Sequence, residues 1–492
     1  MSEANTAIPD PTLASMPFSA EEWAQTPPAV QEFVLALLAQ VQMLEAELAP
    51  LRERMHRNSR NSSRPPSSDG PENPRLPRPR PSSKRQRGAQ PGHPGTTRSL
   101  VPVEQVKAVR DLKPAVCRRC GHELAGADPA PQRHQVTEIP PVVAEVTEYR
   151  LHALPCPACG TATRATLPAG VPASAFGPHL QAMVALLSGQ YHLSQREITT
   201  LLADFFQTEV GLGSVSALEQ RTSATLSTPV SEARAYVPRQ PAVNVDETGW
   251  REANQRAWLW VAAAPQVTVF LIRRSRGGAV AKELLGTTFQ GIVGSDRWSA
   301  YNWLAVHLRQ LCWGHLQRDF QAFVERGGTS QRVGAALLAQ VAVMFHEWHR
   351  VRAGTLDHPT FQHQMPAVQQ RVGELLREGA ACDHPQTAGT CRDILRREAA
   401  LWTFVPVAGV EPTNNLAERQ IRPGVLWRNS SFGTQSEAGS RFVERLMTVV
   451  ATLKQQRRNV LAYLTAACDA ANWGRPAPSL LPDRVVPAGS SP

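Results

Sequence analysis

The sequence predicts a multidomain α/β protein: a mixed sheet flanked by helices, preceded by a coiled coil, a zinc ribbon and a helical region. Three observations predict this class. Apolar residues recur every seven positions near the N-terminus, two Cys-x-x-Cys pairs follow, and short apolar runs alternate with helical patterns after residue 240. With 492 residues, the chain is long enough for about three or four domains.

The net positive charge is concentrated in one segment. Residues 51–110 hold 14 Lys and Arg against 4 Asp and Glu, an excess equal to the formal net charge of +10 of the whole chain. This distribution excludes a uniformly basic, histone-like protein and indicates a near-neutral body with one cationic segment that binds polyanions. No apolar run could span a bilayer and no signal peptide is visible, so we expect a cytoplasmic protein with no membrane partner.

Two apolar seams over residues 30–55 predict a leucine-zipper-like coiled coil, and hence at least a dimer. One seam is Val30, Leu37, Leu44 and Leu51, and the other is Val34, Val41, Leu48 and Met55. The alternative is a single amphipathic helix packed on the protein's own core. Pro50 should end or kink the helix, because proline disrupts helix interiors. We expect residues 1–29 to be disordered.

Residues 56–110 form a linker rich in Pro, Arg and Ser, with few apolar side chains to bury. It is either a solvated tether or an arm that contacts DNA phosphates, and the two roles are compatible. The candidate DNA-binding residues are Arg75, Arg78, Arg80, Lys84, Arg85 and Arg87.

The two cysteine pairs predict one structural zinc ion in a finger over residues 111–165. Cys117 and Cys120 form the first pair, Cys156 and Cys159 the second, and each pair precedes a glycine. One tight turn can supply two thiolates to a tetrahedral zinc, and four cysteines leave no open position. Strand-like alternation over residues 136–151 favours a zinc ribbon.

Residues 166–240 predict a helical region. A helix from Ser194 to Phe206, a turn at Gly211–Gly213 and a helix from Ser214 towards Thr222 have the spacing of a helix-turn-helix. Plain helical packing is the alternative interpretation.

The mixed sheet is predicted from five strands, at residues 242–246, 258–263, 267–273, 291–295 and 306–312, with a helix at 278–285. Helical patterns then run from residue 316 to about 400. Asp246 ends the first of these strands and Asp296 ends the fourth, and Glu418 follows an Asn that can cap a short helix. Three carboxylates can share two divalent cations that act on a phosphodiester. Spacing alone leaves Glu247 and Asp319 as competitors.

Four motifs resemble DDE transposases, and more narrowly the bacterial insertion-sequence sixty-six family. They are Asp246-Glu-Thr-Gly-Trp250, Gly294-Ser-Asp-Arg-Trp-Ser-Ala-Tyr301, Cys312-Trp-Gly-His315 and Thr413-Asn-Asn-Leu-Ala-Glu-Arg419. The linker around residues 61–70 and 87–95 is also similar to that family, and the resemblance covers roughly residues 30–470.

The resemblance implies an RNase H-like catalytic domain over residues 241–475, with a helical insertion at about 321–405 and a disordered tail at 476–492. It implies that Asp246, Asp296 and Glu418 hold two Mg²⁺ (or Mn²⁺) ions. Asn415, Arg419 and Arg422 would lie near them and orient them or hold DNA phosphate. Cys312 and His315 would be structural or supporting residues, with two ordinary core residues as the alternative.

The expected function is that of an insertion-sequence transposase associated with the nucleoid. It would bind terminal inverted repeats, cleave DNA and transfer strands into target DNA, with possible accessory proteins from the same element. A zinc-finger DNA-binding regulator without catalysis and a metal-dependent nuclease without strand transfer are the rivals.

Overall fold

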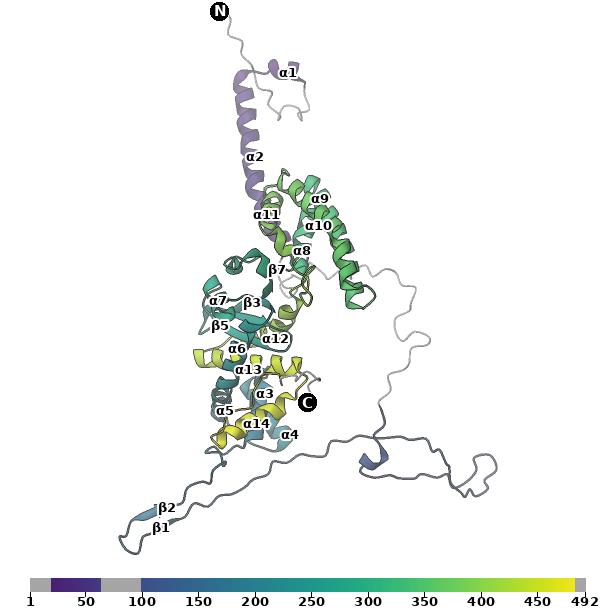
Figure 1. Cartoon of the computed structure of the whole chain (residues 1–492), viewed down its shortest axis with the longest axis vertical. Coiled ribbons are helices and arrows are strands. Elements are labelled where there is room, and N and C mark those ends of the chain that lie inside the picture. Colours follow the sequence, from purple (N-terminus) through teal and green to yellow (C-terminus); the bar gives the residue numbers. More distant parts are fainter. Residues whose placement is uncertain (1–18, 63–98, 483–492) are drawn as a thin grey trace, which may run out of the picture. The chain divides into compact units, whose positions relative to one another are not determined.

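The computed structural model describes residues 19–62 and 99–482, which divide into two compact units (Figure 1). Of these residues, unit 1 contains 19–62, 241–245 and 290–416. Unit 2 contains 99–240, 246–289 and 417–482. Strand β3 and helix α12 each begin in unit 1 and continue into unit 2.

A mixed sheet confirms the predicted α/β class. Its five strands lie in the order β5-β4-β3-β6-β7. In unit 1, the start of β3 (Ala242–Glu252) pairs in parallel with β6 (Ile292–Ser295), and β6 pairs in parallel with β7 (Arg309–Leu311). In unit 2, β4 (Gln255–Ala263) pairs antiparallel with β5 (Thr268–Arg273), and α7 spans Gly278–Leu285.

Strand β3 is much longer than the sequence pattern predicts. It continues six residues beyond Asp246, to Glu252, so the prediction that Asp246 ends the strand is wrong. A two-residue turn joins β3 to β4, with Ala253 and Asn254 at φ of 49° and 60°. Two left-handed residues give the turn the twist that a hairpin needs. The residues around this turn are polar, so a search for apolar runs does not detect the second half of β3.

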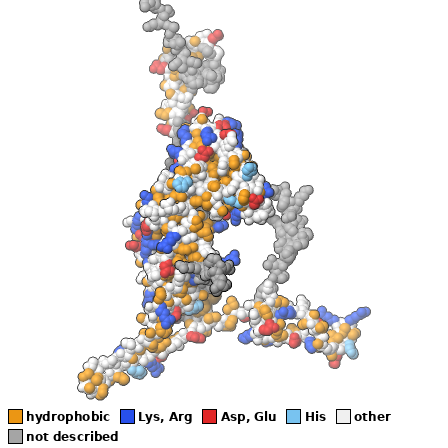
Figure 2. All heavy atoms as spheres, in the orientation of Figure 1, with side chains coloured by type: hydrophobic (Ala, Val, Ile, Leu, Met, Phe, Trp, Pro, Cys, Tyr) orange, Lys and Arg blue, Asp and Glu red, His pale blue; other side chains and the backbone are white. Residues whose placement is uncertain are grey.

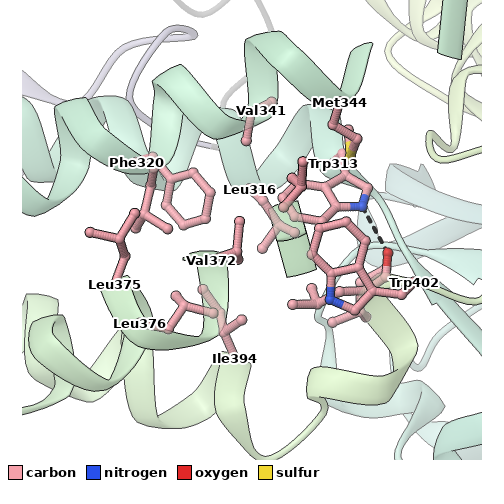
Figure 3. Close-up of a cluster of buried hydrophobic side chains, with 14 of the residues drawn as sticks. Trp313, Leu316, Phe320, Val341, Met344, Val372, Leu375, Leu376, Ile394 and Trp402 are labelled. Atoms are coloured by element: carbon pink, nitrogen blue, oxygen red, sulfur yellow. Dashed lines mark hydrogen bonds between the residues drawn. The ribbon is translucent and has the colours of Figure 1, made fainter. Parts of the chain in front are cut away.

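The helices of unit 1 pack around one apolar core. They are α8 (Trp313–Glu325), α9 (Gly328–Arg352), α10 (His358–Ala380) and α11 (Pro385–Leu395). Figure 3 shows Trp313, Phe320, Met344, Val372 and Ile394 converging from these four helices. The indole N–H of Trp313 donates to the Leu401 carbonyl at 2.8 Å, so the ring fills the core without leaving its polar atom unpaired.

Unit 2 contains the predicted helical region. Besides α7 and most of α12, this unit contains α3 (Pro178–Gly189), α4 (Gln195–Phe206), α5 (Leu212–Thr225), α6 (Ser227–Tyr236), α13 (Glu437–Gln455) and α14 (Val460–Asn472). Ser194 and Glu197 form a capping box that starts α4. Gly189 allows close approach of α3 to α13, because a Cβ there would lie 1.8 Å from a Leu446 methyl carbon.

One edge of the sheet is covered by side chains of α13. The backbone N–H groups of Thr268, Phe270 and Ile272 on β5 donate to the side chains of Thr452, Thr448 and Glu444, respectively. Four helical residues rise about 6 Å and two strand residues about 6.6 Å, so every fourth residue of α13 meets every second residue of β5. Every second N–H of the edge strand therefore has a partner.

The N-terminal segment is helical over most of its described length. Helix α1 spans Ala20–Ala24, inside the segment expected to be disordered, and a capping box of Ser19 and Glu22 begins it. Helix α2 spans Pro28–His56 and continues through Pro50, so of the two predicted effects of this proline the ending of the helix is wrong.

The remaining described elements are short. Strands β1 (Ala153–Pro155) and β2 (Ala162–Arg164) form a separate two-stranded sheet, and 3₁₀ turns occur at Val103–Gln105, Val237–Arg239, Ser299–Tyr301, Val306–Leu308 and Glu398–Leu401. Residues 476–482 pack on unit 2, with Leu480 fully buried, which corrects the expected disorder there. No helix within residues 19–62 and 99–482 is long and apolar enough to cross a membrane.

Candidate metal and nucleic-acid sites

The register of two parallel strands places the first two carboxylates. Asn244 on β3 is the partner of Gly294 on β6. Counting on from that pair, Asp246 is the second residue along β3 and Asp296 is the second residue after Gly294. Side chains two residues apart on a strand point to the same face. A Cβ at position 294 would lie 2.7 Å from the side-chain nitrogen of Asn244. Glycine at this position of β6 therefore leaves the room that the Asn244 side chain needs.

The alternation of β3 separates Asp246 from its competitor Glu247. Asp246 is half-buried, whereas Glu247 points to the opposite face and is only 8% exposed. Arg276 pairs with the Glu247 carboxylate at 2.8 Å and stacks over the Trp258 ring. Glu247 is therefore the partner of a structural cation.

Asp296 lies in the loop immediately after β6. One of its carboxylate oxygens accepts the Trp298 N–H at 2.9 Å, and its carbonyl accepts from Ser295 Oγ and Arg309 Nη2. These bonds fix the backbone at Asp296. The competitor Asp319 pairs with Arg297 at 2.8 Å, as Glu247 does with its own arginine.

Glu418 lies in the first turn of α12 (Asn415–Ser431) and is half-buried. Asn415, Glu418 and Arg422 are spaced by three and four residues, so they share one face of this helix. Asn415, Arg419 and Arg422 are exposed.

The residue before α12 attaches this helix to the sheet, and sequence reasoning missed its role. Asn414 is 1% exposed. Its amide group donates to the Val245 carbonyl at 2.7 Å and accepts from the Asn244 amide at 3.0 Å. The side chain expected to cap the helix therefore binds β3 instead. The sequence feature that could have pointed to this role is the polar Asn244, which lies two residues before Asp246 on the same face of β3.

Cys312 and His315 belong to the same local structure. Cys312 is buried at the N-cap of α8, its N–H donates to the Ser295 carbonyl, and its Sγ accepts the Asn414 N–H at 3.2 Å. His315 is in the first turn of α8, and its N–H donates to the Cys312 carbonyl. Cys312 thus connects the end of β6 and the residue preceding α12, which supports a positioning role.

We expect Asn414→Ala to reduce strand transfer about 10- to 100-fold, because it removes the amide that holds the start of α12 against β3. DNA binding should be unchanged. The Mg²⁺ concentration that gives half the maximal rate should rise, which general loss of stability would not cause. Asn429→Ala, an exposed position of the same helix, is the matched control. An unchanged Mg²⁺ requirement would contradict the positioning role.

The two cysteine pairs each form the turn that zinc knuckles use. Gly121 N–H donates to the Cys117 carbonyl at 2.9 Å and Gly160 N–H to the Cys156 carbonyl at 2.8 Å. Both glycines have a left-handed backbone, with φ of 72° and 74°. Backbone N–H groups of Arg119 and Cys120 point at the Cys117 sulfur and lower the pKa of this thiol. Each turn is therefore preformed for a thiolate ligand.

The structure does not bring the two knuckles together. Within residues 99–482, no three of the four cysteines have sulfurs within 4.8 Å of one another. The strand-like alternation over residues 136–151 forms no strand, and its apolar side chains are exposed. Strands β1 and β2 flank only the second knuckle, while a single bridge between Val116 and Glu123 flanks the first. The expected ribbon is therefore present as two separate halves.

The cationic linker residues lie outside the described part of the chain: Arg75, Arg78, Arg80, Lys84, Arg85 and Arg87. Helices α4 and α5 lie at the two predicted positions and pack through Ile198, Leu202, Val215 and Leu218, and their role as a helix-turn-helix stays a prediction. Gln220 and Arg221 are exposed on α5.

The fold and these side chains define an α/β protein with one carboxylate on β3 and another directly after the neighbouring parallel strand β6, in a chain that also carries cysteine knuckles. Comparison with known families narrows this class of protein to one family. Residues 173–441, more than half of the chain, match the Transposase IS66 family. Residues 114–160 match the zinc-finger binding domain of transposase IS66, and residues 9–99 match a family of unknown function. The chain belongs to the transposase IS66 family, which confirms the family that its motifs resemble.

One curated relative is the uncharacterized protein y4qI of Sinorhizobium fredii. It is 27% identical over 245 residues, and the aligned region covers 45% of each chain. The protein thus spans a little under half the length of this relative.

Proposed function

We propose that this protein is the transposase of a bacterial insertion sequence. It would bind the terminal inverted repeats of its element and catalyse metal-dependent cleavage and strand transfer on an RNase H-like core. The observation that carries the proposal is the parallel register of β3 and β6, which supports Asp246 and Asp296 as neighbouring ligands. Glu418 joins them on a helix whose start is bonded to β3 through Asn414.

The donor set fits two divalent cations, because carboxylate oxygens are the ligands that Mg²⁺ and Mn²⁺ prefer. Asp246, Asp296 and Glu418 would hold the ions. When bound, the ions would activate a water molecule and stabilise the leaving oxygen of a phosphodiester. The protein's own contribution is to hold the three carboxylates in place: Asn414 fixes the start of α12, and Trp298 N–H fixes the Asp296 side chain.

The exposed arginines of α12 would act on the substrate. Arg422 shares the helix face of Glu418, one turn further along, and its guanidinium can pair with a phosphate through two hydrogen bonds. Arg419 and Asn415 flank Glu418 on the exposed side of the same turn. These side chains would orient the scissile phosphate relative to the carboxylates.

The decisive assay measures strand transfer with DNA that carries the element's own ends, in Mg²⁺ and in EDTA. We expect cleavage and joined products in Mg²⁺ and none in EDTA. Cleavage without joining would identify a nuclease, and DNA binding without either reaction would identify a regulator.

We further propose that α2 pairs with α2 of a second copy. The exposed apolar seams of this helix support pairing, since Leu37 and Leu44 are 50% and 47% exposed. Apolar side chains are visible along α2 in Figure 2. A heptad repeat of this kind buries its seams against a partner helix.

Leu37→Asp combined with Leu44→Asp should convert a dimer to a monomer, because pairing would bury both charges in an apolar seam. We expect the dissociation constant of the dimer to rise at least about a hundredfold. Light scattering during size-exclusion chromatography measures the mass. Gln42→Asp, outside both seams, is the matched control and should remain dimeric. A wild-type chain that is monomeric at micromolar concentration would contradict the pairing.

A further inference from the structure

The end of helix α12 carries an exposed aromatic side chain. Phe432 comes directly after Ser431, the last residue of the helix, and is 77% exposed. Within residues 166–482, no other large apolar residue is as exposed. A single exposed apolar residue is ordinary on a protein surface. The backbone and the neighbours of Phe432 are what indicate that it has a use.

The backbone of Phe432 is unfavourable for a bulky residue. Its φ is 59°, in the left-handed region. The Phe432 N–H donates to the Arg428 carbonyl at 2.8 Å, so this residue ends the helix in the position that glycine or asparagine usually fills. A large side chain raises the energy of that conformation, and such residues cluster at functional sites. Neither packing nor backbone preference accounts for phenylalanine at this position.

The chain after Phe432 is fixed to the turn between β3 and β4. Thr434 N–H donates to the Arg251 carbonyl at 2.9 Å, and the Thr434 carbonyl accepts the Ala253 N–H at 2.8 Å. A Cβ on Gly433 would lie 2.2 Å from the Arg251 carbonyl oxygen, so only glycine allows the two segments to approach this closely. Arg251 is exposed. The turn therefore holds Phe432 in place and brings the backbone of an exposed arginine beside it.

The last turns of α12 are also fixed. The Arg428 guanidinium donates to the Thr248 hydroxyl at 3.1 Å and to the Gly249 carbonyl on β3. A Cβ on Gly424 would lie 2.4 Å from a Leu259 methyl carbon, so glycine lets this helix pack closely on β4. Because the backbone is fixed on both sides of the exposed ring, the ring would lose little conformational freedom on binding a partner.

The exposed side of α12 carries cations and an apolar group. Arg419, Arg422, Leu426 and Asn429 are exposed and are spaced by three and four residues, so they share one face of the helix. The only acidic residue of α12 is Glu418, the proposed metal ligand, which is half-buried. The exposed face is therefore positively charged, and it leads to the aromatic residue at the helix end.

A strand of DNA matches this combination of groups. Guanidinium groups pair with phosphate oxygens, and an aromatic ring stacks on the face of a base. The central area of a protein–protein interface is instead depleted of charged residues. In a duplex the faces of the bases are hidden in the stack, so a ring can stack only on a base that has left it. The chemistry therefore favours DNA with an unpaired base over a protein partner.

We propose that Phe432 stacks on an unpaired base at the end of the element. The inference rests on the proposed function, in which Arg422 orients the scissile phosphate relative to Glu418. Phe432 is fourteen residues beyond Glu418, which corresponds to about 20 Å along a helix and to about six stacked nucleotides. The unpaired base would thus lie within about six nucleotides of the cleavage position. Stacking would keep the strand open there.

The test compares the affinities of the full-length protein for two labelled duplexes in EDTA, by fluorescence anisotropy. Both carry the element's own end, but one is fully paired and the other has about six mismatched pairs beside the cleavage position. The wild type should bind the mismatched duplex more tightly, because that duplex needs no unpairing. Phe432→Gly should bind it roughly five- to a hundredfold more weakly and lose the preference. Phe432→Trp should keep the preference, whereas Phe432→Leu, which has no ring, should lose most of it.

Phe432→Gly separates stacking from stability, because glycine adopts a φ of 59° without strain. Its melting temperature should equal or exceed that of the wild type. Val343→Ala, which shortens an exposed apolar side chain of α9, is the matched control and should keep the preference. Equal affinities of the wild type for the two duplexes, or a Phe432→Gly chain with an unchanged preference, would overturn the proposal. A Phe432→Gly chain that differs only in its mass by light scattering would also overturn it, because the ring would then contact protein.

The result is separable from that of the strand-transfer assay. Binding in EDTA needs no catalysis, so a chain without strand transfer can still show the predicted loss of preference. Conversely, an active transposase whose preference does not depend on Phe432 would contradict only the stacking.

Discussion

Asp246→Asn should abolish strand transfer and leave binding to the element's ends nearly unchanged. The substitution keeps the shape of the side chain and removes the charge that a divalent cation needs. We expect the rate to fall at least about a hundredfold in the assay with Mg²⁺. Because Asp246 is half-buried and its Oδ1 accepts the Glu247 N–H at 2.9 Å, an amide oxygen can keep that bond, so the strand should stay folded.

Two controls make this result specific. Asp204→Asn changes an exposed carboxylate on α4 and should transfer strands like the wild type. Glu247→Gln should lower the melting temperature, since it removes the buried carboxylate that pairs with the half-buried Arg276. Full strand transfer by Asp246→Asn, with both controls as expected, would remove Asp246 from the metal site.

The second large effect is expected at the cysteine knuckles. The purified protein should contain about one zinc per chain, and Cys156→Ser should lose it, because three thiolates hold zinc much less tightly than four. Without zinc, the sulfurs of the two knuckles do not cluster within residues 99–482. Binding to the element's ends should therefore weaken at least about tenfold. Elemental analysis and anisotropy with the terminal repeats measure the two effects.

Cys382→Ser is the control for this experiment, since Cys382 is a half-buried cysteine on neither knuckle. It should retain both the zinc and the affinity. A Cys156→Ser chain that keeps one zinc would show that another set of ligands binds the metal.

The sequence predicts the sheet well where apolar residues are continuous and poorly where they are not. Strands β4, β5 and β6 lie within one or two residues of their predicted positions, apart from the N-terminal extension of β4. The second half of β3 was missed because its alternating polar residues, Glu247 to Glu252, resemble a loop. The register that aligns Asp246 with Asp296 is a property of backbone pairing, which apolar patterns do not specify.

The choice between neighbouring carboxylates also required the structure. In the sequence, all four residues are simply carboxylates, so nothing distinguishes Glu247 and Asp319 from Asp246 and Asp296. Only their ion pairs with Arg276 and Arg297 show that their charge serves the fold. The family resemblance had already selected Asp246 and Asp296, but it gave no physical reason for that choice.

In the finger, the cysteine spacing predicted the local turns correctly, whereas the apolar pattern did not predict the strands. Cysteine spacing predicted two knuckle turns, and both are formed. The alternation over residues 136–151 predicted strands that are absent, because apolar alternation needs a surface to pack on. In a finger this small, a bound metal would supply the stability that an apolar core otherwise provides.

The hydrogen bonds from β5 to α13 restrict how copies of this protein can assemble. An open edge strand can recruit a strand from another molecule, which leads to extended sheets and aggregation. Here Thr452, Thr448 and Glu444 occupy the donors that an incoming strand would need. Growth of the sheet at β5 is therefore blocked, so two copies cannot associate by adding a strand at this edge.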